Sequence, residues 1–131
     1  MDNMKLHHIG VATKNIEREF VIFKKLGYKK SSEVFVDEIQ KIKGMFIEAE
    51  NQPCLELLEN LSDDGPLTNH LKKGNKFYHF AYTTKDIEKD YNNLLAQGAI
   101  PVVKITKATY FKRICFVMMK NMMLIELVEE K

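Results

Sequence analysis

The stretch "HIGVATKNIE" at residues 8–17 returns in altered form as "HFAYTTKDIE" at residues 79–88. An offset of 71 aligns residues 8–27 with 79–98, and six of the twenty aligned pairs are identical: His8/His79, Thr13/Thr84, Lys14/Lys85, Ile16/Ile87, Glu17/Glu88 and Gly27/Gly98. A second match follows at an offset of 70, where "CLELLE" at 54–59 meets "LIELVE" at 124–129 and pairs Glu56 with Glu126. The same order of segments therefore occurs twice, which indicates two copies of one module.

Each copy has the local pattern of a mixed module. Residues 4–12 and 77–83 are rich in β-branched and aromatic residues, which favours strands. Helices are predicted at 15–26 and 86–97, because Asn15 and Asp86 are good N-caps and Gly27 and Gly98 suit a left-handed C-terminal position. Further strands are predicted at 33–36, 39–49 and 53–59 in the first copy, and at 100–105, 111–119 and 123–129 in the second.

These elements predict an α+β fold of two βαβββ modules. Module one covers about 4–59, a turn-rich linker covers 60–76, and module two covers about 77–129, within a single domain of residues 1–131. The linker has room for one short helix from Pro66. Apolar stripes at helical spacing should be buried: Ile16, Phe20 and Phe23 in the first helix, and Ile87, Tyr91 and Leu94 in the second.

The bulk composition narrows the class of protein. The chain has 131 residues and a net charge of +2, from 20 basic and 18 acidic side chains. That balance argues against a nucleic-acid partner. No apolar run approaches the roughly 18 residues of a membrane span, and the first residues lack a signal-peptide core. We therefore expect a soluble cytoplasmic protein. The two cysteines, Cys54 and Cys115, are too few for a disulfide framework.

The alternation of strand side chains sorts the first strand of each module into two faces. One face carries bulky residues that should pack on the module's helix: His7, Ile9 and Val11 in the first copy, and Tyr78, Phe80 and Tyr82 in the second. The opposite face carries His8 or His79 among small residues, which leaves a hollow. In the last strand of each module, Glu56 and Glu126 lie among apolar neighbours, where a carboxylate is costly unless it is paired, hydrogen-bonded or metal-bound.

Two interpretations of these four residues compete. Taken singly, a histidine on a strand is usually a polar core residue, and Leu-Glu-Leu is common in half-exposed strands. Taken jointly, equivalent positions of two repeated modules would meet near a two-fold axis. Two histidines and two glutamates would then offer two nitrogen and two oxygen donors, a suitable set for a first-row divalent cation with room for water or substrate. We expect His8, Glu56, His79 and Glu126 to surround one such ion.

The segments "HHIGVATKNIE", "LELLENLSDDGPLTNHLKKG", "YHFAYTTKDIE" and "LIELVE" resemble the glyoxalase / vicinal-oxygen-chelate superfamily, and within it the methylmalonyl-CoA epimerases. The resemblance spans the whole chain. It implies paired βαβββ units in an eight-stranded, open, barrel-like cup around a metal ion. It places the metal ligands at the same four residues. The ion would be zinc, cobalt, nickel or manganese, and relatives are often homodimers.

The resemblance also implies a reaction: metal-assisted removal of a proton next to a carbonyl, with a small acyl thioester such as an acyl-CoA as substrate. Glu126 would serve as ligand and as catalytic base. Epimerases of this kind are expected to carry a second glutamate, and an ungapped alignment puts Gly44 there, with Glu38 or Glu48 reaching the position only after a shift in register. A glyoxalase I-like lactoylglutathione lyase and a non-catalytic, drug-binding protein on the same fold are the alternatives.

Overall fold

The computed structural model describes residues 4–131, so residues 1–3 of the predicted domain lie outside the described part. The described residues hold nine strands and three helices in a mixed α+β fold. They form two compact units by chain contacts: residues 8–78, called the first unit, and residues 4–7 with 79–131, called the second unit. The long linker predicted at 60–76 belongs to the first unit.

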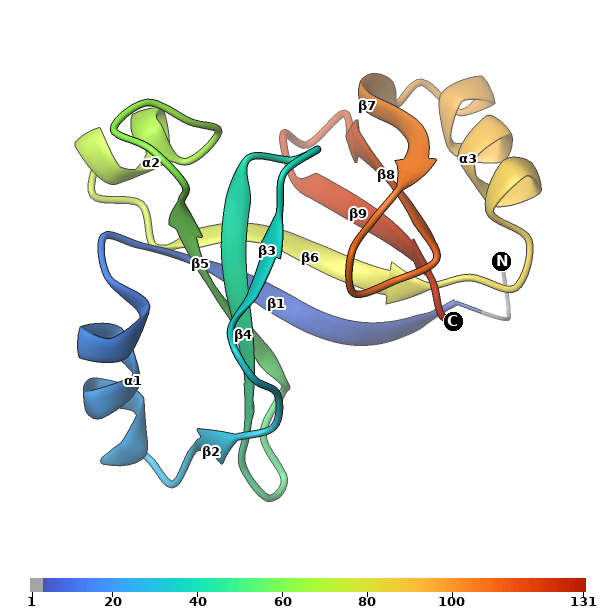
Figure 1. The fold of residues 1–131 in the computed structure, drawn as a ribbon. Coiled ribbons are helices and arrows are strands. Elements are labelled where there is room, and N and C mark those ends of the chain that lie inside the picture. The colour runs from blue at the N-terminus through green and yellow to red at the C-terminus, as the bar shows by residue number, and fades with distance from the viewer. Residues whose placement is uncertain (1–3) are drawn as a thin grey trace. The chain divides into compact units, whose positions relative to one another are not determined.

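The first unit contains six strands or strand parts and two helices (Figure 1). In chain order they are β1 (Lys5–Thr13), α1 (Ile16–Lys24), β2 (Lys29–Lys30), β3 (Phe35–Asp37), β4 (Ile42–Glu48), β5 (Leu55–Asn60), α2 (Thr68–Lys72) and the start of β6 (Phe77–Thr83). Its strand order is β2-β4-β5-β1, with β3 also paired to β4. Strand β5 is antiparallel to β4 and parallel to β1.

The second unit repeats this arrangement. It contains the first residues of β1, most of β6, α3 (Ile87–Ala96), β7 (Ile100–Lys107), β8 (Arg113–Met118) and β9 (Leu124–Glu129). Its strand order is β6-β9-β8-β7, and β9 is antiparallel to β8 and parallel to β6. The βαβββ order is therefore confirmed in both copies. The strands number nine rather than eight, because two short strands of the first unit, β2 and β3, pair with β4 where the second unit has the single strand β7 paired with β8.

The predicted helix ends are present. The side chain of Asn15 accepts a hydrogen bond from the amide of Arg18, and that of Asp86 accepts one from the amide of Lys89. These bonds satisfy amides of the first turn that have no partner within the helix. Gly27 and Gly98 have φ of 97° and 104°, a left-handed conformation that disfavours residues with a Cβ.

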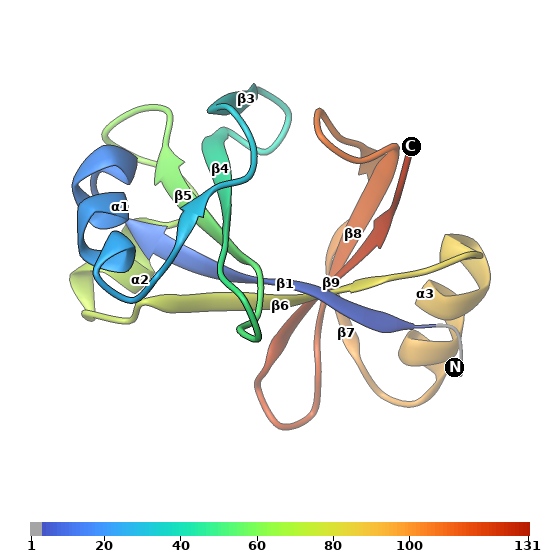
Figure 2. The same ribbon diagram turned by 90° about the horizontal axis from the view of Figure 1, so that it is seen from below.

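One helix packs on the strands of each unit. Helix α1 packs on β5, and α3 packs on β7, β8 and β9 (Figure 2). The helix stripes are buried as predicted, except that Phe23 is only partly covered. The core of the first unit consists of Val11, Ile16, Phe20, Tyr28, Met45, Ile47, Leu55 and Leu57. That of the second consists of Ile87, Tyr91, Leu94, Cys115, Val117, Ile125 and Leu127.

Two residues of the predicted bulky faces pack elsewhere. Tyr78 contacts the cluster beside α2, and its ring lies 4.8 Å from that of His70. The ring of His7 lies 5.0 Å from that of Phe111. Both positions are at the beginning of a strand whose first residues belong to a different unit from the rest, so each packs within that unit. The prediction that they pack on α1 or α3 was wrong.

The helices are short. Among residues 4–131, no helix has both the length and the apolar character that crossing a membrane requires.

Candidate metal centre

In the first unit the structure brings His8 and Glu56 together. His8 lies on β1 and Glu56 on the adjacent β5, where Glu56 is opposite Gly10. The Nε2 atom of His8 lies 3.0 Å from Oε1 of Glu56. The two residues are only 0% and 6% exposed, so both polar groups have been withdrawn from water. Small residues on β1, Gly10 and Ala12, share the face of His8, as the sequence predicts.

In the second unit His79 and Glu126 form the same pair. Glu126 lies on β9 opposite Ala81 of β6, as Glu56 lies opposite Gly10. The Nε2 atom of His79 lies 3.0 Å from Oε1 of Glu126, and the residues are 3% and 4% exposed. The equivalence that the repeat predicts for these side chains is therefore present in their partners, distances and burial.

A phenylalanine ring contacts the histidine of each pair, and the sequence analysis did not predict this contact. Phe46 on β4 is opposite Glu56, and its ring makes an edge contact with His8 at 5.0 Å. Phe116 on β8 is opposite Glu126, and its ring makes an edge contact with His79 at 5.2 Å. The signal was in the sequence, because Phe46 and Phe116 are separated by the same offset of 70 that relates the two glutamates.

The donor chemistry of the pairs fits a divalent cation. Imidazole nitrogens and carboxylate oxygens are ligands for zinc and other first-row metals. The nitrogen–oxygen separation of 3.0 Å in each pair matches neighbouring ligands of an octahedral ion whose bonds are about 2.1 Å long. The same separation also suits an N–H···O hydrogen bond. That His8, Glu56, His79 and Glu126 share one ion stays a prediction.

The charge of Glu56 affects Cys54, which precedes it by two residues. Burial, followed by the negative charges of Glu48 and Glu56, raises the pKa of the Cys54 thiol to about 11. The thiol is therefore protonated near neutral pH. Thiolate, rather than thiol, is the form that attacks substrates or binds metals, so Cys54 does not add a nucleophile to the site in this state.

The position expected for a second catalytic glutamate is Gly44 on β4. It lies opposite Leu58 and is buried, on the same face as Phe46 and Glu56. Neither alternative glutamate shares this burial. Glu48 at the end of β4 and Glu38 beyond β3 are both exposed.

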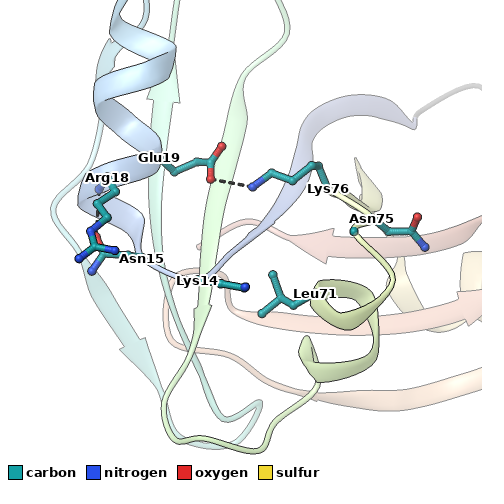
Figure 3. A pocket seen from close by; sticks show the side chains of 8 residues that line it. Lys14, Asn15, Arg18, Glu19, Leu71, Asn75 and Lys76 are labelled. Carbon is teal, nitrogen blue, oxygen red and sulfur yellow. Dashed lines mark hydrogen bonds and ion pairs between the residues drawn. The ribbon is translucent and has the colours of Figure 1, made fainter.

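A separate hollow of the first unit lies between the start of α1 and the loop after α2 (Figure 3). Its volume is about 340 Å³, and it is lined by Lys14, Asn15, Arg18, Glu19, Leu71, Gly74, Asn75 and Lys76. Across it, Nζ of Lys76 lies 2.6 Å from Oε1 of Glu19, so these two charges offset each other (Figure 3). This hollow contains none of the four predicted ligands.

Comparison with known proteins places the chain in a family. The profile of the Glyoxalase/Bleomycin resistance protein/Dioxygenase superfamily matches residues 7–117. The chain belongs to this superfamily. No curated protein matches the chain significantly.

Solved structures share the fold over nearly the whole chain. A hypothetical protein from Bacillus halodurans C-125 is 25% identical, with a TM-score of 0.85 over 98% of this chain and 95% of that one. Methylmalonyl-CoA epimerase from Mycobacterium tuberculosis is 22% identical, with a TM-score of 0.83 over 96% and 87%. A Streptomyces coelicolor methylmalonyl-CoA epimerase, solved with 2-nitronate-propionyl-CoA, is 21% identical, with a TM-score of 0.81 over 96% of both chains. The α+β fold of the vicinal-oxygen-chelate type is thereby confirmed.

Proposed function

We propose that this protein is a divalent-metal-dependent enzyme that removes a proton next to a carbonyl, acting on a small acyl thioester as methylmalonyl-CoA epimerases do. The observation that carries the proposal is the pair of buried His–Glu contacts, His8–Glu56 and His79–Glu126, at equivalent positions of two repeated units. A buried carboxylate needs a compensating partner, and a shared cation would compensate both. His8, Glu56, His79 and Glu126 would hold zinc, cobalt, nickel or manganese.

A hydrogen next to a thioester or ketone is too weakly acidic for an unaided carboxylate at neutral pH. When bound, a divalent cation would polarise the substrate carbonyl and stabilise the negative charge that develops on its oxygen. The chain's own contribution is the proton transfer. Glu126 would accept the α-proton on a carboxylate oxygen and return it to the carbon, while His8 and His79 would bind the ion through nitrogen lone pairs. Phe46 and Phe116 would keep water away from the two pairs.

One observation favours the second candidate, a glyoxalase I-like isomerisation of a hemithioacetal. Inverting a carbon needs proton access to both of its faces, and the expected position of a second base is Gly44, which has no side chain. Moving a proton between neighbouring carbons on one face can use a single carboxylate. The buried His–Glu pairs speak against the third candidate, a non-catalytic drug-binding protein, because such a function has no need of them.

The decisive experiment combines metal analysis with isotope exchange. Elemental analysis of the protein as purified should give about one divalent ion per chain. Incubation with methylmalonyl-CoA in deuterated water should replace the α-hydrogen, and a chelator should stop the exchange. Turnover of a methylglyoxal–thiol adduct without exchange into any acyl thioester would support the glyoxalase-like candidate instead. Bound metal with neither activity would refute both enzymatic proposals.

We also expect a homodimer, as in many relatives that the sequence resembles. Light scattering of the metal-loaded protein measures this directly, since the chain mass is 15.3 kDa.

A further inference from the structure

One carboxylate oxygen of Glu56 lies against β4 at a place where the chain has no side chain. A Cβ atom added to Gly44 would lie 3.1 Å from Oε2 of Glu56 and 2.7 Å from Cζ of Phe35. The second distance is shorter than real Cβ atoms tolerate. The described glycines with positive φ are Gly27, Gly74 and Gly98, so the backbone of Gly44 does not itself require glycine. Glycine is needed at position 44 for space.

The space above Gly44 is filled by Phe35 of β3. Strand β3 pairs with β4, and Phe35 is directly opposite Gly44. Its ring stacks on that of Phe46, with centroids 5.7 Å apart and planes at 19°. Phe46 in turn contacts the edge of the His8 ring. Phe35 and Phe46 therefore form one aromatic wall that bounds both predicted ligands of the first unit, His8 and Glu56.

The second unit lacks a glycine at the equivalent position. Ile114 on β8 is equivalent to Gly44, because it pairs with Val128 as Gly44 pairs with Leu58. Ile114 is fully buried. The two glutamates therefore have equivalent histidine and phenylalanine partners but different neighbours on the adjacent strand. The surroundings of the two carboxylates therefore differ at this position.

We propose that Gly44 and Phe35 are positioning residues that hold Glu56 in place as a metal ligand, a support that Glu126 does not have. This inference rests on the proposed function, because it presumes that Glu56 binds the ion. It distinguishes two residues that the repeat alone makes equivalent. A side chain at position 44 would compete with Phe35 and Glu56 for one space, so metal binding should fall when that space is filled.

The test measures Co²⁺ binding and the visible absorption of bound Co²⁺, which reports the ligand geometry, in four proteins: wild type, Gly44→Ala, Phe35→Ala and the double variant. Gly44→Ala should weaken Co²⁺ binding by about 10–100-fold, the usual effect of disturbing a group that orients a ligand, and should shift the absorption bands. In the Phe35→Ala background the same glycine substitution should cost much less, because the ring that it would strike is gone.

Gly65→Ala is the matched control. A Cβ at Gly65 would lie 2.5 Å from Oδ1 of Asn60, a comparable clash in the same unit but outside the His8–Glu56 pair. This variant should lose stability and keep the wild-type cobalt spectrum. If Gly44→Ala proves too unstable to purify, Phe35→Ala alone still tests the proposal, since loss of the wall should weaken Co²⁺ binding several-fold.

Three results would overturn the inference. They are an unchanged cobalt affinity and spectrum in Gly44→Ala, an equal loss from that substitution with and without Phe35, or wild-type cobalt binding in Phe35→Ala. A wild-type protein that binds no Co²⁺ at all would instead refute the proposed function, so the two failures are distinguishable.

Discussion

Metal ions should stabilise the folded protein, and Glu126→Gln should remove most of that stabilisation. A ligand that binds only the native state at 1,000 times its dissociation constant adds about 4.1 kcal/mol to the free energy of unfolding. Glu126 is 4% exposed and lies beside His79. Glutamine keeps its size but loses its charge, which would leave half of the cation's charge without a buried counter-charge.

We expect the substitution to weaken binding by about 100-fold, or roughly 2.7 kcal/mol. At the same free metal concentration, the stabilisation should then fall from about 4.1 to about 1.4 kcal/mol. For a chain of this length, the lost increment corresponds to a melting temperature lower by on the order of 10 °C in the presence of metal. Urea unfolding with and without Co²⁺ or Zn²⁺, at a buffered free concentration, measures the increment in each protein. Glu56→Gln should lose a similar part of the stabilisation by metal.

Glu129→Gln is the control for this experiment. Glu129 is on the same strand as Glu126 but on its other face, where it accepts hydrogen bonds from Arg113 at 2.7 and 3.0 Å. Its loss should lower stability equally with and without metal and should leave the metal increment intact. An increment in Glu126→Gln equal to that of the wild type would show that Glu126 is not a ligand. If none of zinc, cobalt, nickel and manganese raises the unfolding free energy of the wild type, the proposed metal site is refuted.

Three further predictions concern the scaffold. Phe20→Ala should cost about 3–5 kcal/mol in urea unfolding, since Phe20 is 9% exposed on the buried face of α1. Val21→Ala, at a position of the same helix that is 57% exposed, should cost less than about 0.5 kcal/mol. Hydrogen bonds from Arg113 lower the pKa of Glu129. The stabilisation from these bonds is therefore fully present above the ordinary carboxyl pKa of 4.5 and is lost as the pH falls through the lowered pKa. The difference in unfolding free energy between wild type and Arg113→Met should accordingly shrink in acid. Burial raises the pKa of the fully buried Cys115 thiol to about 12, so iodoacetamide at pH 8 should label it only after unfolding, and labelling of the folded protein would contradict its placement.

The sequence predicted the features that depend on local pattern or on the repeat. The N-caps Asn15 and Asp86 are local, because a side-chain oxygen reaches only the next few amides. The helix stripes are local as well, since helical periodicity alone decides which residues share a face. The His–Glu pairs depended on the repeat, because neither glutamate is close in sequence to its histidine, and only the equivalence of the two copies distinguished them from ordinary strand residues.

Other features could not be predicted because they depend on which strands become neighbours. The exposed pair Lys29–Lys30 forms β2 only because β4 lies beside it, and two lysines have no strand preference of their own. The destination of Tyr78 depends on where the strand crosses from one unit to the other. The packing around Glu56 depends on β3, which places Phe35 opposite Gly44. The sequence contains no separate signal for this pairing.

The comparison of two copies also has a built-in limit that bears on function. An offset of 70 detects what the copies share, such as the sets of one histidine, one glutamate and one phenylalanine. It also detects an ion pair on the opposite face of the sheet in each copy. Nζ of Lys43 lies 3.3 Å from Oε2 of Glu59, and Nε of Arg113 lies 2.7 Å from Oε1 of Glu129. Shared features are suited to tasks that are alike in both units, such as holding an ion or fixing the sheet. A proton transfer that uses only one of two metal-binding carboxylates needs a difference between the copies. Gly44 and Ile114 are such a difference at the site, so the roles of Glu56 and Glu126 are best sought in the positions where the repeat fails.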